Sequence, residues 1–121
     1  MDLQGKSKLL RIFTGEDDRI GHDLLHEKIL FAARESGLAG GTIIKGIMSF
    51  GASSRVHRAK LIELSDDLPV VIEIVDAVEK IEAFLPVIND LFEQCGKGGL
   101  ITIENVVQNI SRSDCEVFPT F

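Results

Sequence analysis

The chain has 121 residues, of which 45% are hydrophobic and 26% are charged. This length supports one domain with a sizeable core and is too short for two ordinary domains, so we expect a single domain over residues 1–121. The formal net charge is −6. That charge argues against nucleic acid binding over a broad surface, which would require a basic face.

Residues 1–8 are polar, and no apolar run approaches the length that crosses a bilayer. Cys95 and Cys115 form neither a CxxC pair nor a cluster with histidines, a pattern typical of reduced structural thiols. We therefore expect a soluble, cytoplasmic protein with no covalently bound cofactor.

The first half of the chain alternates strand and helix signals. Residues 8–14 are rich in β-favouring side chains and predict a strand, which an acidic turn follows over residues 15–19. Helical spacing of Leu25, Ile29 and Ala32 predicts a helix over residues 22–36, with Gly37 as its C-terminal cap. Residues 42–48 predict a second strand.

The second half begins with weaker signals. Residues 49–58 predict a flexible loop, residues 60–64 a short strand and residues 70–75 a central strand. Asp76 and Glu79 have the spacing of a capping box, which predicts a helix from there to Gly96 that is kinked or broken at Pro86. Residues 100–107 predict the last strand.

This order predicts an α+β fold, a ferredoxin-like βαββαβ sandwich with two helices on one face of an antiparallel sheet. The predicted strands at 8–14 and 70–75 place apolar side chains on both faces of the sheet, so the second face also needs a cover. Other copies of the chain are the favoured cover, which predicts a homo-oligomer. The alternative is that the C-terminal tail, residues 108–121, folds back over that face.

A basic segment lies within an otherwise acidic chain. Residues 52–60 (ASSRVHRAK) contain no acidic residue, and guanidinium groups with serine hydroxyls are suited to phosphate. The candidates are Ser53, Ser54, Arg55 and His57. A solvated basic hairpin is the alternative interpretation.

The sequence CGKGG, residues 95–99, joins the second helix to the last strand. Its glycines allow backbone amides to approach a ligand, and Lys97 supplies positive charge. It matches neither a Walker A pattern nor a Rossmann fingerprint. Considered by itself, this segment is better explained as a helix cap followed by a tight turn.

Glu16, Asp17, Asp18, His22 and His26 could gather around a divalent metal, but the spacing fixes no ligand set and a solvated acidic turn is favoured. We therefore assign no metal. The sequence also lacks a nucleophile elbow, an HExxH pattern and a carboxylate pair suited to acid–base chemistry. We do not expect an enzyme.

Three stretches together resemble a known family: GLAGGTIIKGIMSFG at 37–51, SSRVHRAK at 53–60 and LPVVIEIVDAVEKIEAFLP at 68–86. They look like an uncharacterised branch of the PII-like superfamily of trimeric signalling proteins. The resemblance covers about residues 8–107. It implies a homotrimer that binds an adenine nucleotide (AMP, ADP or ATP) between subunits and contacts a partner through a loop, here about residues 49–67, called the T-loop.

The resemblance also implies positions for the nucleotide. Thr42 would lie near the adenine, Phe50 and Gly51 at the entry of the loop, and the glycine turn near the phosphates. The implied set is completed by Gly96, Lys97, Gly98, Gly99 and Arg112. The turn is shorter than the PII pattern and lacks its second lysine, and the absence of tyrosine rules out tyrosine uridylylation.

Two rival interpretations remain open. One is a divalent-metal-binding trimer like the CutA proteins, which share this architecture and would use His22, His26 and nearby carboxylates. The other is a regulatory subunit of a membrane transporter such as a fluoride exporter, with the loop as a plug.

Overall fold

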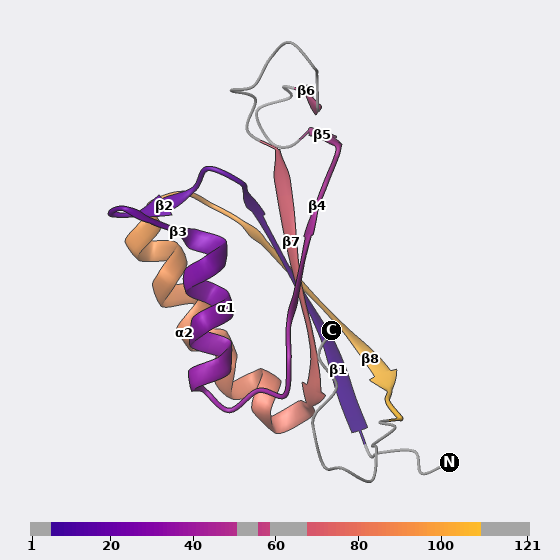
Figure 1. The fold of residues 1–121 in the computed structure, drawn as a ribbon. Helices are drawn as coiled ribbons and strands as arrows, with labels where there is room; N and C mark the ends of the chain where they lie inside the picture. The colour runs from indigo at the N-terminus through magenta and orange to yellow at the C-terminus, as the bar shows by residue number, and fades with distance from the viewer. Residues whose placement is uncertain (1–5, 51–55, 59–67, 110–121) are drawn as a thin grey trace, which may run out of the picture.

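The computed structural model describes residues 6–50, 56–58 and 68–109. Two helices, α1 (Leu25–Glu35) and α2 (Val78–Cys95), pack on one face of a four-stranded antiparallel sheet (Figure 1). The strands of the sheet are β1 (Lys6–Gly15), β4 (Thr42–Lys45), β7 (Pro69–Ala77) and β8 (Leu100–Val107), in the order β4-β7-β1-β8. This arrangement confirms the predicted ferredoxin-like βαββαβ fold.

The core lies between the helices and the two central strands. Alternate residues of β1 and β7 point toward the helices, so that one set of side chains from each strand is fully enclosed. Burying each large aliphatic or aromatic side chain stabilises the fold by about 1.5–3 kcal/mol. The core residues with almost no exposed surface are Leu10, Ile12, Ile72, Ile74, Leu25, Ile29, Ile81, Phe84 and Ile88.

The capping box predicted at Asp76 and Glu79 is wrong. Asp76 is buried at the end of β7, and Ala77 is the residue that caps α2, without a side-chain hydrogen bond. The Asp76 carboxylate instead accepts the N–H of Ala39 at 2.9 Å and the N–H of Ala77 at 2.7 Å. A contact 37 residues away in sequence therefore replaces the local one.

We expect Asp76→Ala to lower the free energy of unfolding by about 1–3 kcal/mol, because the part-buried Ala39 amide loses its acceptor. Glu79→Ala is the matched control. Glu79 is exposed, so this change is expected to stay within about 0.5 kcal/mol. Urea unfolding at one fixed protein concentration measures both, and equal losses in the two variants would contradict the assignment.

Helix α1 begins later than the predicted residue 22. The strands β2 (Arg19–Ile20) and β3 (Asp23–Leu24) pair as a tight hairpin just before it, and the Leu25 N–H donates to the Asp18 carbonyl at 2.8 Å. These four strand residues are too few to show a period in the sequence. The predicted C-terminal glycine is confirmed, since Gly37 has a φ of 83° immediately after Ser36.

The predicted loop over 49–58 is partly wrong. The strands β5 (Met48–Phe50) and β6 (Val56–Arg58) pair antiparallel, and this hairpin extends beyond one end of the main sheet (Figure 1). Strand β4 also ends at Lys45 rather than at residue 48, although the next residue, Gly46, still donates its N–H to the Pro69 carbonyl of β7 at 2.8 Å. The short strand predicted at 60–64 lies outside the described residues.

Pro86 neither ends nor divides α2, which runs as one helix from Val78 to Cys95. The predicted break at this residue is therefore wrong. Gly96 follows with a φ of 78°, and its N–H bonds the Phe92 carbonyl at 2.9 Å. This left-handed cap satisfies a carbonyl that the end of the helix would otherwise leave unpaired.

Candidate functional site

One face of the sheet carries no helix among the described residues. Strand alternation and register place a single set of side chains on this surface, which we call the open sheet face. Ile44 is 46% exposed and Leu100 is 56% exposed, which is a high exposure for large apolar side chains on the main sheet of a protein. The open sheet face comprises Leu9, Arg11, Phe13, Thr42, Ile44, Val71, Glu73, Val75, Leu100, Thr102 and Glu104.

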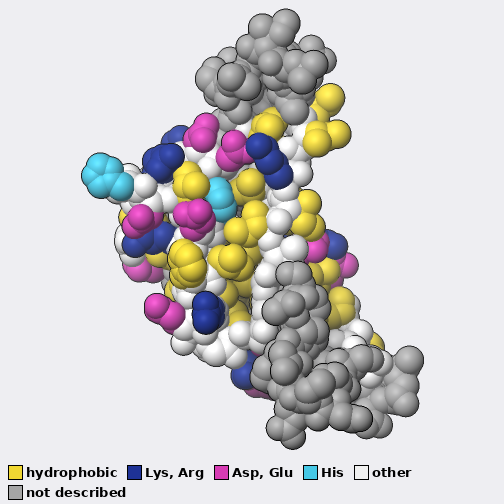
Figure 2. Space-filling model, in the orientation of Figure 1, with side chains coloured by type: hydrophobic (Ala, Val, Ile, Leu, Met, Phe, Trp, Pro, Cys, Tyr) yellow, Lys and Arg dark blue, Asp and Glu magenta, His cyan; other side chains and the backbone are white. Residues whose placement is uncertain are grey.

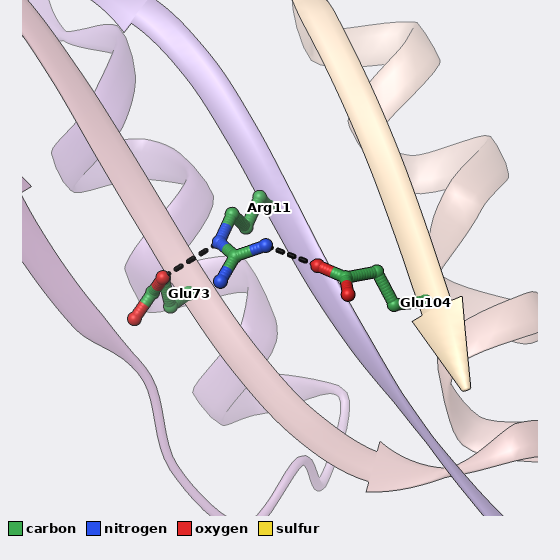
Figure 3. Close-up of polar contacts among 3 residues, drawn as sticks. All are labelled: Arg11, Glu73 and Glu104. Carbon is green, nitrogen blue, oxygen red and sulfur yellow. Dashed lines mark hydrogen bonds and ion pairs between the residues drawn. The ribbon is translucent and has the colours of Figure 1, made fainter. Parts of the chain in front are cut away.

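An ion-pair ladder crosses the middle of the open sheet face (Figure 3). The Arg11 Nε donates to Glu73 Oε2 at 2.8 Å, and Arg11 Nη1 donates to the Glu104 carboxylate. The pKa of Arg11 is raised, mainly by the hydrogen bond to Glu73 and next by the hydrogen bond to Glu104. The ladder joins β7, β1 and β8 and leaves one surplus negative charge among apolar side chains.

Two glycines of the turn between α2 and β8 have local structural roles. Gly96 adopts the left-handed conformation that caps α2. A Cβ on Gly99 would lie 2.5 Å from Cζ of Phe92 and 3.0 Å from the carbonyl oxygen of Phe13, so a larger residue there would require the Phe92 ring to move. These two positions support the cap-and-turn interpretation of CGKGG.

Gly98 has no such requirement. Its φ lies outside the left-handed region, and a Cβ built on it would meet nothing within 4 Å. Its neighbour Lys97 extends into solvent, with 64% of its side chain exposed. The turn therefore combines one structurally unexplained glycine with an accessible cation, which is a surface that an anion could approach closely.

Lys97 already has a partner within the chain. Its Nζ lies 3.4 Å from Oδ1 of Asp18, whose side chain is only 7% exposed. The other Asp18 oxygen accepts the Gly15 N–H at 2.9 Å, and the Asp18 carbonyl accepts the Leu25 N–H. Asp18 thus connects the end of β1, the start of α1 and the glycine turn, a role that the acidic character of residues 15–19 did not reveal.

Thr42 and the glycine turn lie apart within one chain. Thr42 is exposed on β4, whereas the turn leads into β8, and these strands form opposite edges of the sheet. Three strand spacings of about 4.8 Å separate the two edges. Within one chain, Thr42 and the glycine turn therefore do not form one compact site.

The other predicted site residues lie in or near the β5–β6 hairpin or outside the described part. Phe50 pairs with Val56, and His57 pairs with Ser49, in the backbone register of the hairpin. The structure does not describe Gly51, Ser53, Ser54, Arg55 or Arg112. These five assignments therefore stay predictions.

The described residues contain no group of three histidine, cysteine or acidic side chains arranged to hold a metal ion. His26 packs in the first turn of α1, and its Nδ1 is buried without a hydrogen-bond partner among these residues. Neither α1 nor α2, the helices in the described part, is long and apolar enough to cross a membrane.

Comparison with protein families matches residues 7–108 to the DUF190 family, described as "Uncharacterized ACR". A UPF0166 protein of Aquifex aeolicus is 42% identical over 102 residues, covering 84% of this chain and 91% of the relative. A UPF0166 protein of Methanocaldococcus jannaschii is 34% identical over 113 residues, covering 93% of each chain. The similarity to both relatives therefore extends over most of the chain.

The solved structures with a similar fold include PII-like proteins. CPII of Thiomonas intermedia K12, a nitrogen regulatory PII-like protein solved with ADP, AMP and bicarbonate, superposes with a TM-score of 0.66 at 18% identity, covering 88% of this chain and 91% of CPII. A candidate PII-like signalling protein of Thermus thermophilus gives 0.64 at 19% identity, covering 89% and 93%. The chain therefore belongs to the DUF190 (UPF0166) family and has the ferredoxin-like fold of the PII-like proteins.

Proposed function

We propose that this protein is a regulator rather than an enzyme, that it forms a homotrimer, and that it binds an adenine nucleotide between subunits. The observation that carries the ligand class is the similarity in fold to CPII, which was solved with ADP and AMP bound. The nucleotide is AMP, ADP or ATP. Its binding changes the surface that residues 49–67 offer to a protein partner.

The open sheet face supports the assembly. Its exposed apolar side chains, including Ile44, Val75 and Leu100, represent burial that a single chain leaves unused. The position of Thr42 and of the glycine turn on opposite edges supports a site between copies. In this arrangement Lys97 and Gly98 of one copy face the phosphates, and Thr42 of the next lies near the adenine.

The projecting β5–β6 hairpin supports the partner surface. Ile47 and Met48 at its base are 76% and 57% exposed, which suits a protein contact. In the proposed site, Phe50, Gly51, Ser53, Ser54, Arg55 and His57 follow along this segment, with Arg112 from the tail. Charge-assisted contacts between Arg55 and a phosphate would order the segment and couple nucleotide level to partner binding.

Thermal unfolding with AMP, ADP, ATP, cyclic dinucleotides and divalent metals tests the proposal. A ligand that binds only the folded protein raises its stability by about 2.7 kcal/mol at a concentration 100 times its Kd. We expect one or more adenine nucleotides to raise the unfolding temperature. The nucleotide proposal would be contradicted if only metals raised the unfolding temperature, or if none of the compounds did.

Gly98→Ala is expected to weaken nucleotide binding roughly ten-fold, equivalent to about 1.4 kcal/mol, because its methyl group occupies the space that a phosphate would approach. The variant should fold as well as the wild type or better, since alanine has less freedom in the unfolded chain, by about 0.4–1 kcal/mol. Isothermal titration calorimetry with ADP and urea unfolding separate the two effects. Glu93→Ala, an exposed change on α2, serves as the control, and unchanged affinity in Gly98→Ala would exclude close approach at this turn.

A further inference from the structure

A groove of about 430 Å³ is lined mainly by residues of α1, with one residue of β3 and one of α2. The lining has an apolar part, three carboxylates and one ammonium group: Phe31, Ala32 and Leu91; Asp23, Glu27 and Glu35; and Lys28. In Figure 2, hydrophobic and acidic side chains are interspersed over the region of the helices. This groove shares no residue with the proposed nucleotide site.

Phe31 is the main anomaly of the groove. The core-facing residues of α1 include Leu25, Ile29 and Ala33, whereas Phe31 is 59% exposed on another face of the helix. Glu27 lies one turn before it and Glu35 one turn after it, so the aromatic ring has a carboxylate on each side along the helix. An aromatic side chain in this position contributes nothing evident to the core.

The charges of the groove are unbalanced. Asp23 is paired with Lys28 at 3.4 Å, but within the described part of the chain Glu27 and Glu35 have no ion-pair partner. Two carboxylates flanking an exposed aromatic ring are complementary to a guanidinium group. Arginine stacks on aromatic faces and donates forked hydrogen bonds to carboxylates, whereas lysine provides only a compact charge.

We propose that this groove binds a basic, arginine-bearing segment of a partner protein, with an arginine stacked on Phe31 between Glu27 and Glu35. The proposed homotrimer leaves the groove accessible, because the open sheet face lies on the other side of the sheet from the helices. Aromatic residues and desolvated charge pairs commonly dominate the affinity of protein interfaces. The groove is therefore a second protein-binding surface, separate from residues 49–67.

The probe is a fluorescently labelled peptide of alternating arginine and alanine, with a lysine–alanine peptide for comparison. Fluorescence anisotropy with the full chain at low salt is expected to show roughly three- to ten-fold tighter binding of the arginine peptide. Phe31→Ala and the double change Glu27→Gln with Glu35→Gln should each weaken that binding about ten-fold. The control is Glu79→Gln with Glu82→Gln, which removes the same charge from exposed positions of α2 outside the groove.

Three results would overturn the proposal. The first is no measurable binding of the arginine peptide, and the second is equal binding by wild type and Phe31→Ala. The third is a change of oligomeric state in Phe31→Ala by sedimentation, which would identify a second copy as the occupant. The ADP affinity of Phe31→Ala is expected to match that of the wild type. The groove proposal and the nucleotide proposal can therefore each be contradicted without affecting the other.

Discussion

Val75→Asp is expected to convert the proposed trimer, about 40 kDa from three chains of 13.3 kDa, into a monomer. Val75 lies on the open sheet face beside Leu9, so the new carboxylate would be buried among apolar side chains of neighbouring copies. Desolvating an unpaired charge costs several kcal/mol per copy, and its like-charged neighbour Glu73 adds repulsion. Analytical ultracentrifugation measures the mass.

The monomer should still fold, because Val75 is 36% exposed in the single chain. Val107→Asp is the matched control: Val107 is 71% exposed and lies on the other side of its strand from the open sheet face. This variant is expected to remain trimeric. If Val75→Asp has the same mass as the wild type, the open sheet face is not the assembly interface.

Loss of the charge on Lys97 is expected to lower ADP affinity about 10- to 100-fold, since a hydrogen bond to a charged group contributes about 1.5–3 kcal/mol. Lys97→Gln removes the charge and retains much of the side-chain length. Stability should change by no more than about 1 kcal/mol, because the partly exposed ion pair with Asp18 is screened by solvent. Calorimetric titration with ADP provides the affinity.

Asp18 supplies a way to separate a ligand contact from a structural one. If Lys97 only held the turn in place through Asp18, then Asp18→Asn would weaken ADP binding as much as Lys97→Gln, and the double variant would add nothing. Direct contact predicts a different result: Asp18→Asn binds ADP at least as tightly, because it releases Lys97 from a competing carboxylate. Lys45→Gln, which breaks the 2.7 Å pair with Glu16, controls for loss of a nearby lysine.

Most of the fold was predictable because its signals are local. The apolar period of residues 25–33, the β-favouring run at 70–75 and the glycine after each helix all act over a few residues, and the structure confirms the elements that they indicated. The errors arose where tertiary contacts override such patterns. Asp76 has the spacing of a capping residue but bonds Ala39, and the β2–β3 hairpin is too short to have a detectable period.

The candidate site was only partly predictable. Lys97 and its glycines were recognisable as a group, but the sequence could not distinguish Gly98 from Gly96 and Gly99, because that distinction depends on backbone φ and on the position of the Phe92 ring. Asp18 was visible only as part of an acidic turn. Its role depends on a partner that lies at the far end of α2.

The sequence by itself determined the order of the two helices and the four strands of the main sheet, the presence of apolar residues on both faces of that sheet and the grouping of glycines around Lys97. These properties depend on neighbours within a few positions along the chain. Only the tertiary structure decided that Arg11 meets Glu73 and Glu104, partners 62 and 93 residues away, and that Thr42 and the glycine turn lie on opposite edges. The physical reason is strand register: a shift of one residue would move every side chain of a strand to the other face, and the register depends on the packing of the whole core.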